Sequence, residues 1–391
     1  MLNGPFSPWP CYTDEEKQAV LAVMDSNRVN YWTGTEARKF EQEFARFCDT
    51  EHAIALANGT VALDLCFRVL DLPKGSEVIV TSRTFIASVS SIVLAGLVPV
   101  FADVDPDSQN ITADTIAPLI NDNTAAIVCV HLGGWPCEMD DINALAGQHA
   151  LYVIEDCAQA HGAKYKGRPV GSLGHLAAWS FCQDKIMTTA GEGGMLTTNN
   201  TELWQKAWAF KDHGKSYQAV YERAHPPGFR WLHESFGTNW RMTEIQATVG
   251  RIQLQRMPDW QSQRQNNASR LLKTAASLPG LRVPEIPSHI LHAFYKYYAF
   301  VQPQQLAPGW DRDRIISRII ELGVPCFSGS CSEVYQEKAF DETGWRPTSP
   351  LKCAHELGET SLMFLVHPGI TGDEITKSCD VLHQVMHEAS L

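Results

Sequence analysis

The chain has 391 residues, of which 44% are hydrophobic, so it can bury the cores of two domains. Its 44 acidic residues outnumber its 32 lysine and arginine residues, and the net charge of −12 argues against non-specific nucleic-acid binding, which needs a basic surface. No signal-peptide pattern and no stretch near the roughly 18 apolar residues of a membrane-spanning helix is found, and the eleven cysteines form no Cys-x-x-Cys pair, so we expect a cytoplasmic protein without membrane or nucleic-acid partners.

Up to residue 155, predicted strands alternate with predicted helices. Apolar runs predict strands at 52–57, 77–80, 98–101, 125–130 and 151–155. Helical spacing predicts helices at 12–24, 36–47, 61–70, 86–95 and 139–149, the first opening with a capping box of Thr13 and Glu16. This alternation is typical of an α/β fold with a largely parallel sheet covered on both faces, and ligands of such sheets bind at the carboxyl ends of the strands.

Two turns at predicted strand ends carry candidate binding residues. Asn58-Gly59-Thr60 leads from a strand directly into a helix, so free backbone amides and the positive end of a helix dipole meet at one point and can bind an anion. Such turns are also common without a ligand. Phe85 follows the strand at 77–80, where an aromatic ring covers a flat ligand or is simply part of the core.

Asp156 follows the strand at 151–155 directly, among small apolar residues. A carboxylate in that setting needs a cationic or hydrogen-bonding partner. Two interpretations remain open at this point, a ligand-binding carboxylate and a helix N-cap.

A single lysine stands between an apolar strand and a glycine-rich turn. The strand is predicted at 176–181, Lys185 follows it, and three glycines lie within 191–194. Lysine is rarely fully buried without a partner. In a partly desolvated pocket its amine loses the proton more readily and becomes a nucleophile towards carbonyls. A surface lysine in a loop between two strands would give the same pattern.

The last third of the chain has a different organisation. A helical pattern runs from Thr243 to about Ala276, interrupted by Pro258, and we interpret it as the bridge to a second domain. Beyond it, a strand is predicted at 292–301 and helices at 312–322 and 373–388. The expected division is a large α/β domain at 1–250 and a smaller α+β domain at 251–391.

Motifs of other enzyme classes are missing or incomplete. The sequence has no Gly-x-Gly-x-x-Gly after a strand and no Gly-x-Ser-x-Gly, and His233-Glu234 lacks the second histidine of a zinc-protease motif. The segment 213–216 resembles the end of a phosphate-binding loop, but Ala209 stands where a glycine is needed. The 14 histidines show no metal-ligand spacing, and we predict no metal site.

A lysine nucleophile, a carboxylate at a strand end, an anion-binding turn and an aromatic ring are the parts that a pyridoxal phosphate site needs. The chain also resembles one family that uses this cofactor, the DegT/DnrJ/EryC1/StrS sugar aminotransferases. The matching motifs lie, in the family's order, at 58–63, 83–87, 130–134, 155–162, 180–194 and 237–242. They cover roughly residues 10–260, and their ordered combination is far more specific than any one of them.

The resemblance implies the aspartate-aminotransferase fold (fold type I) and a homodimer with active sites at the subunit interface. It also implies the catalytic roles. Lys185 would form the Schiff base with the cofactor and move a proton to and from the substrate carbon, and Asp156 would pair with the ring nitrogen. The other implied cofactor contacts are Gln159 at the ring hydroxyl, Phe85 stacked on the ring, Gly59, Thr60 and Ser180 at the phosphate, and Asn239 at the phosphate from the neighbouring subunit.

The activity implied by the resemblance is ping-pong transamination. An amino group would pass from glutamate, through pyridoxamine phosphate, to a nucleotide-linked keto-deoxysugar used for lipopolysaccharide, O-antigen or other glycan synthesis. Lys185 argues against the dehydratases of the family, which carry histidine there. Amination of a cyclitol ketone, another pyridoxal phosphate reaction such as dehydration, and a non-catalytic sensor or scaffold stay as alternatives. The segment 326–335 departs from the family's usual loop near the sugar, which leaves the nucleotide and the ring carbon open.

Overall fold

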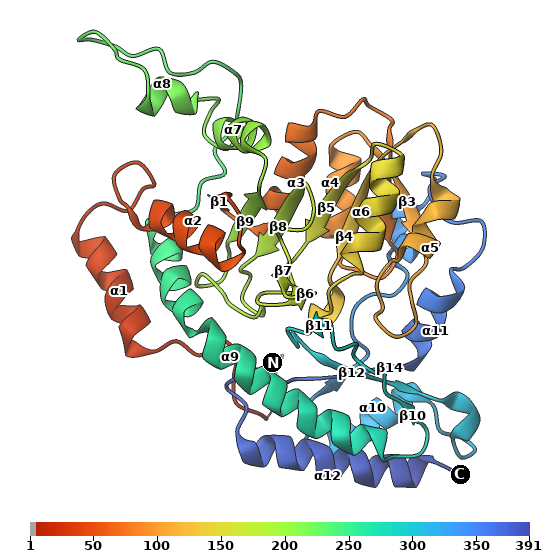
Figure 1. Cartoon of the computed structure of the whole chain (residues 1–391). Helices are drawn as coiled ribbons and strands as arrows, with labels where there is room; N and C mark the ends of the chain where they lie inside the picture. Colours follow the sequence, from red (N-terminus) through yellow and green to blue (C-terminus); the bar gives the residue numbers. More distant parts are fainter. Residues whose placement is uncertain (1–4) are drawn as a thin grey trace.

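A seven-stranded sheet forms the centre of the larger part of the molecule (Figure 1), and the computed structural model describes residues 5–391. In spatial order the strands are β1 (His52–Leu56), β9 (Gly194–Thr198), β8 (Leu176–Ser180), β5 (Tyr152–Asp156), β4 (Thr124–Val130), β2 (Glu77–Thr81) and β3 (Val98–Ala102). The last five pair in parallel, whereas β9 runs antiparallel to both of its neighbours. The predicted α/β fold with a mixed, mostly parallel sheet is confirmed.

Helices cover both faces of this sheet, which explains why its strands are apolar throughout. In β2, Val78 and Val80 pack on one face and Ile79 on the other, as the alternation of a strand requires. The first face is covered by α3 (Gly59–Leu70), α4 (Ala87–Leu94) and α7 (Thr201–Phe210), and the second by α2 (Glu36–Phe47), α6 (Met139–Gln148) and the start of α9 (Glu244–Ala276). The remaining helices of this part are α1 (Asp14–Asp25), α5 (Ala113–Ile116) and α8 (Tyr217–Tyr221).

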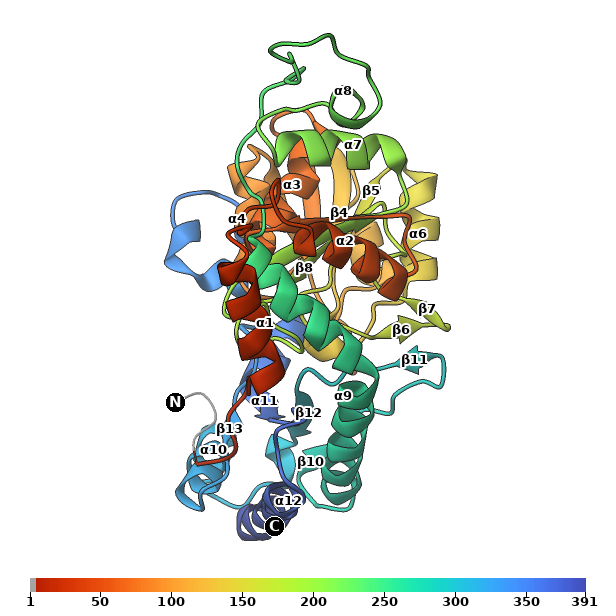
Figure 2. The ribbon, with the colours of Figure 1, turned by 90° about the vertical axis from the view of Figure 1, so that its left-hand side faces the viewer.

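The smaller part lies beyond α9, at the bottom of Figures 1 and 2. Its antiparallel sheet has the order β10 (Leu281–Arg282), β12 (Tyr297–Val301), β14 (Ser361–Phe364) and β13 (Cys326–Phe327). Three helices accompany this sheet, α10 (Arg312–Glu321), α11 (Lys352–Thr360) and α12 (Gly372–Ala389). A small third sheet joins the two parts and contains β11 (Ile290–Leu291), β6 (Lys164–Tyr165) and β7 (Arg168–Pro169). Of the helices described, none has both the length and the apolar composition needed to cross a bilayer.

Helix α9 contributes to both cores. Leu254 and Met257 pack in the core of the larger part, and Leu271 packs in that of the smaller part. The predicted interruption at Pro258 is wrong, because α9 continues through this residue. A proline inside a helix costs about 3 kcal/mol, and packing at both ends of α9 outweighs that cost. The predicted domain boundary after residue 250 stays a prediction, and it lies within this helix.

The predicted strand at 292–301 is shorter in the structure, because β12 begins only at Tyr297. The residues before it turn towards the larger part instead. The amides of Ala293 and Tyr295 donate to the carbonyls of Gly134 and Gly133, at 2.8 and 2.9 Å, and Phe294 has a φ of 48°. Two glycines of the larger part thus take the hydrogen bonds that a neighbouring strand would have provided.

The buried side chain of His292, in this turn, should make the unfolding free energy of the protein depend on pH. Burial lowers its pKa to about 3, and its Nδ1 accepts a hydrogen bond from the amide of Phe294 (2.8 Å). In an unfolded chain the pKa of histidine is about 6.5, so the unfolded state takes up the proton first as the pH falls. The stability present above about pH 6.5 is therefore lost progressively towards pH 3.

His292→Asn keeps an acceptor but cannot titrate. Below about pH 6, the unfolding free energy of the wild type should fall relative to this variant by about 1.4 kcal/mol per pH unit. Chemical unfolding at pH 7.5 and 5.5 measures the difference, and His383→Asn, at an exposed site on α12, is the matched control. Parallel curves for wild type and His292→Asn would contradict the prediction.

Candidate active site

A cavity of about 620 Å³ lies at the carboxyl edge of the central sheet, and Lys185 and Asp156 both line it. Asp156 is the last residue of β5, and Lys185 follows β8, the strand that pairs with β5. The start of α3 and the residues after β2 complete the wall. We call this space the cofactor cavity. Two residues that the sequence singled out separately therefore share one enclosed space.

The anion-binding turn Asn58-Gly59-Thr60 lies against the end of β8. The side chain of Asn58 caps α3 by accepting from the amide of Val61 (3.0 Å), which fixes where the helix begins. A Cβ on Gly59 would lie 2.6 Å from the Cβ of Ser180, so no other residue fits without a shift. Gly59, Thr60 and Ser180 all line the cavity. The first amides of the helix, which have no acceptor within it, and two hydroxyls are thus grouped at one end.

Asp156 is held by hydroxyl and amide donors. Its Oδ2 accepts from the Ser88 hydroxyl (2.7 Å) and its Oδ1 from the amide of Ala158 (3.1 Å). Because Ser88 donates to Asp156, the Thr84 hydroxyl, 2.8 Å away, donates to Ser88. These bonds satisfy and orient both oxygens of a carboxylate that is buried. A turn and not a helix follows Asp156, so the residue is not the N-cap considered from the sequence.

Lys185 is fixed by its surroundings on two sides. Its backbone carbonyl accepts from the indole Nε1 of Trp9 (2.8 Å), which ties the N-terminal segment to the lysine turn. Its Nζ lies 3.9 Å from Asp184 Oδ1 and 5.2 Å from the centre of the Tyr295 ring. Burial alone would raise the pKa of Asp184, but the charges of Lys185 and Lys296 and the hydrogen bond from the Tyr295 hydroxyl bring it below its usual value.

Phe85 and Gln159 line the same cavity. The Phe85 side chain is 69% exposed, which is unusual for a phenylalanine and leaves a ring face open to a ligand. The Gln159 Oε1 accepts from the amide of Gly133 (2.7 Å), so the NH₂ end of this side chain is the one that can donate to a ligand oxygen. Both placements suit the expected contacts with the ring, which stay predictions.

Asn239 lies apart from this cavity within the described chain. It is exposed, and its backbone bridges to Asp212 after the long excursion that contains α8. A contact between Asn239 and the cofactor phosphate would therefore have to be made in a second subunit.

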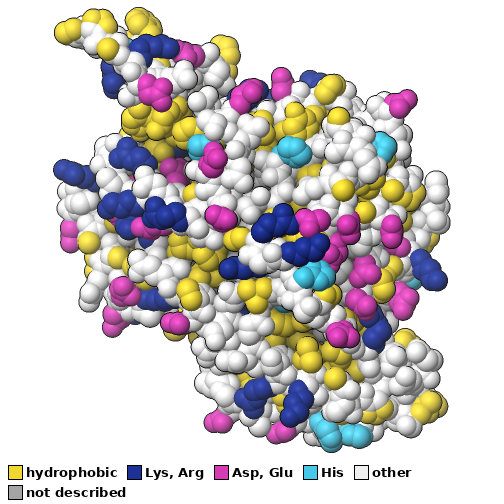
Figure 3. Space-filling model, viewed as in Figure 1, with side chains coloured by type: hydrophobic (Ala, Val, Ile, Leu, Met, Phe, Trp, Pro, Cys, Tyr) yellow, Lys and Arg dark blue, Asp and Glu magenta, His cyan; other side chains and the backbone are white. Residues whose placement is uncertain are grey.

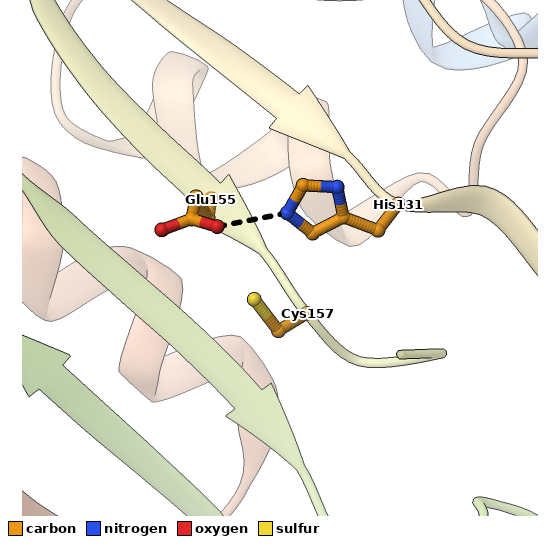
Figure 4. Close-up of side chains that lie close together, drawn as sticks. All are labelled: His131, Glu155 and Cys157. Atoms are coloured by element: carbon orange, nitrogen blue, oxygen red, sulfur yellow. Dashed lines mark hydrogen bonds and ion pairs between the residues drawn. The ribbon is translucent and has the colours of Figure 1, made fainter. Parts of the chain in front are cut away.

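Three buried side chains beside the cavity are of types that bind metal ions, but their nitrogen and carboxylate oxygen atoms are already used in hydrogen bonds. His131, Glu155 and Cys157 lie close together (Figure 4). His131 Nδ1 accepts from the amide of Cys137 (3.0 Å), so Nε2 donates to Glu155 (2.9 Å). Glu155 also accepts from the amides of Gly171, Leu173 and Gly174 at 2.7–2.9 Å. The group holds the end of β5, and with it Asp156, in place.

Comparison with known proteins decides the family. The DegT/DnrJ/EryC1/StrS aminotransferase family matches residues 10–383. The chain is 35% identical to a GDP-perosamine synthase of Caulobacter vibrioides over 96% of this chain and 97% of that protein. It is 30% identical to a UDP-N-acetyl-3-dehydro-alpha-D-glucosamine 3-aminotransferase of Acidithiobacillus ferrooxidans, over 99% and 97%. The crystal structure of an aminotransferase from Psychrobacter cryohalolentis is 60% identical, covers 98% of this chain and 99% of that one, and has a TM-score of 0.96.

The chain belongs to the DegT/DnrJ/EryC1/StrS aminotransferase family. The family, the fold, the aminotransferase class and the pyridoxal phosphate cofactor predicted from the sequence are confirmed. The cavity fits that cofactor, because the end beside Gly59 groups helix amides and hydroxyls that suit a phosphate, and the far end has a hydrogen-bonded carboxylate that suits a ring nitrogen. Gly59, Thr60 and Ser180 would hold the phosphate, and Asp156 the ring nitrogen.

A second cavity of about 370 Å³ adjoins the first and was not predicted. Phe85, Gln159, Asp184 and Lys185 line both. Its other walls come from the N-terminal segment and the smaller part, and include Trp9, Tyr295, Lys296, Tyr298 and His367. Asp184 could have been suspected because it adjoins Lys185 in sequence, and Ser88 because it follows Phe85 in the same motif region. The others carry no local signal and are brought to the site only by the fold.

The atypical segment 326–335 forms one wall of the second cavity. Arg83, completely buried at the end of β2, fixes this segment to the larger part. Its three nitrogens donate to Gln109 Oε1 (3.0 Å), Ser332 Oγ (2.7 Å) and Ser361 Oγ (2.7 Å). This guanidinium is bound by neutral oxygens, and through Ser332 it supports the wall of the second cavity.

Gly59→Ala should impair cofactor binding, because the added carbon forces α3 away from Ser180. We expect the affinity for pyridoxal phosphate to fall at least about tenfold, corresponding to ~1.4 kcal/mol. Titration of apoprotein with the cofactor, followed by visible absorbance, measures it. The control is Gly147→Ala in α6, where an added Cβ meets nothing within 4 Å. Equal affinities in the two variants would exclude the steric account.

Ser88→Ala removes the donor to Asp156 Oδ2. It should weaken cofactor binding about five- to tenfold, which corresponds to the loss of one hydrogen bond of about 1–1.4 kcal/mol. Ser90→Ala, two residues on in the same helix, is the control, because its hydroxyl faces the carbonyl of Ala87. The same titration tests both variants, and an unchanged affinity in Ser88→Ala would show that Asp156 does not depend on this bond.

Proposed function

We propose that the protein transfers an amino group from glutamate to the keto carbon of a nucleotide-linked keto-deoxysugar. The observation that carries the proposal is the single cavity shared by Lys185 and Asp156, which adjoins a second cavity large enough for a sugar. Two relatives named for GDP-linked and UDP-linked amino sugars support this substrate class over cyclitols. Because those two names carry different nucleotides, the nucleotide stays open.

When bound, pyridoxal phosphate supplies an aldehyde for the amine and a ring that withdraws electrons from the substrate carbon. The residues of the chain provide the rest. Lys185, at the junction of the two cavities, can take a proton from the substrate carbon and return one to it. Asp156 would hold a proton at the ring nitrogen, and Ser88 orients this carboxylate. The anion-binding turn, which lines the same cavity as Lys185, would hold the phosphate.

The shared lining of the two cavities has a kinetic consequence. We propose that donor and acceptor both reach Lys185 from the second cavity, which shares Phe85, Gln159 and Asp184 with the cofactor cavity. Binding of one therefore excludes the other, which is the ping-pong order expected of this reaction.

Lys185→Ala tests the catalytic assignment. The variant should lose the absorbance of the enzyme-bound cofactor, and its amino exchange with glutamate should slow by at least about 100-fold, the usual contribution of a general acid-base group. The measurements are the visible spectrum and the release of 2-oxoglutarate with a panel of keto sugars. Lys273→Ala, at an exposed position near the end of α9, is the control. Unchanged exchange in Lys185→Ala would refute the proposed function.

The active enzyme is proposed to be a homodimer. An arm formed by α8 and residues 222–236 projects from the larger part (Figure 1) and exposes Phe229, Trp231 and Phe236 by 78%, 81% and 99%. Hydrophobic side chains are visible on this projection and at its base in Figure 3. Exposed aromatic residues in such a cluster are typical of a protein interface. Asn239, just after the arm, would reach the phosphate in the neighbouring subunit.

Mixing two inactive variants tests this arrangement. If Asn239 serves the partner's site, a mixed dimer of Lys185→Ala and Asn239→Ala contains one site with both residues intact. Mixing after partial unfolding should then restore up to about a quarter of the wild-type activity, given random pairing and one good site in each mixed dimer. If Asn239 serves its own subunit, every site lacks one residue and mixing restores nothing.

The location in the cytoplasm and the role in lipopolysaccharide, O-antigen or other surface glycans are part of the same proposal. All eleven cysteines are free thiols in the structure, and six of them are buried: Cys48, Cys66, Cys129, Cys137, Cys157 and Cys326. Free thiols in this number suit a reducing compartment.

A further inference from the structure

Two lysines and two carboxylates line the second cavity, but only one of the carboxylates is partly buried, and the chain as a whole has a net charge of −12. Lys185 and Lys296 line it, and Arg264 lies behind Trp9, with its guanidinium 5.3 Å from the centre of that ring. Asp184 is the carboxylate beside them, and Glu337, the other one on the lining, is exposed to solvent. His367 is neutral, because burial lowers its pKa to about 3. The cavity is therefore suited to an anionic ligand.

Lys296 is the cation in this wall that has no partner. Among residues 5–391 no carboxylate oxygen lies within 4.0 Å of its Nζ; Asp184 acts on it only from a longer distance, and the centre of the Tyr295 ring is 4.7 Å away. In contrast, Lys185 lies beside Asp184, and Arg264 donates to the carbonyls of Phe294 and Tyr295. A partly desolvated ammonium without an acceptor is costly, and a ligand anion would remove that cost.

The backbone explains how Lys296 comes to face the cavity. In a strand, Tyr295 and Lys296 would point to opposite sides. Here β12 begins only at Tyr297, and the preceding turn is fixed to Gly133 and Gly134, so both side chains border the cavity.

The place of Lys296 distinguishes its ligand from the cofactor phosphate. None of the described phosphate-end residues Gly59, Thr60 and Ser180 lines the second cavity. The Nζ atoms of Lys185 and Lys296 lie 5.2 and 4.7 Å from the same ring centre, that of Tyr295. A group that meets Lys296 is therefore only a few bonds from the carbon that reacts at Lys185.

We propose that Lys296 binds a carboxylate of the substrate, close to the reacting carbon. This assignment rests on the proposed function and adds to it a ligand class for one residue. The carboxylate can come from a dicarboxylic amino donor or from an acidic sugar, and a charge-assisted hydrogen bond is the interaction in either case.

Two pairs of unreactive probes separate these sources. Glutarate is compared with glutaramate, and UDP-glucuronate with UDP-glucose, in calorimetric titrations of the cofactor-loaded enzyme. We expect the wild type to bind the more acidic member of at least one pair about ten- to a hundredfold more tightly. The pair that shows the preference identifies the source.

Three variants assign the preference to the side chain. Lys296→Met, which keeps the length of the side chain, should abolish the preference, and Lys296→Arg, which keeps the charge, should retain most of it. Lys377→Met, at an exposed position on α12, should behave as the wild type. The visible spectrum of each variant shows whether it is folded and loaded.

Three results would overturn the assignment. They are an undiminished preference in Lys296→Met, no preference in the wild type for either pair, and an equal loss of UDP-glucose and UDP-glucuronate binding, which would place Lys296 at the nucleotide phosphates. The proposed function is judged separately, by amino exchange in the wild type. If the wild type exchanges amino groups but shows no preference for the acidic probes, the proposed function stands and the role of Lys296 is refuted. If the preference depends on Lys296 but no exchange occurs, Lys296 binds a carboxylate and the proposed function is refuted.

Discussion

The contact between Gly59 and the end of β8 is the constraint on which the site depends. Helix α3 can begin against Ser180 only because residue 59 has no side chain. The contact fixes the anion-binding end of the cavity, and the chain that leaves Ser180 reaches Lys185 five residues later. Asp156 enters from β5, paired in register with Ala178 of β8. Three segments far apart in the sequence are thus held at set separations by the backbone of one sheet.

Buried charges around the site are stabilised in two different ways. Glu155 and Arg83 are surrounded by hydrogen-bonding groups of the chain, and their role is to hold strand ends and a loop in place. Lys185 and Asp184 pair with each other less closely and face open space. The rigid groups lie behind the cavities and the less satisfied groups line them, which is the pattern expected where a ligand completes the electrostatics.

The sequence was sufficient for six of the seven strands of the large sheet, all but β9, and for placing Asp156 and Lys185 after two of them. Apolar runs ending in Asp156, Ser180 and Asn58-Gly59-Thr60 give both the strand and the side chain at its carboxyl end. It was insufficient where tertiary packing outweighs local preference, as at Pro258 within α9 and in the turn before β12. The second cavity could not be foreseen for the same reason, because Trp9, Lys296 and His367 come from segments with no signal of their own and meet only when the smaller part is docked.

The bonds of Arg83 bear on attempts to redesign the substrate range of this enzyme. Segment 326–335 is the natural place to graft a loop from a relative, since it lines the second cavity. Yet Ser332 within it accepts a hydrogen bond from a guanidinium that is completely shut off from water. A transplanted loop without a hydroxyl at that position would leave a donor stranded in the interior. Successful grafts should therefore exchange the loop and residue 83 together, or retain the serine.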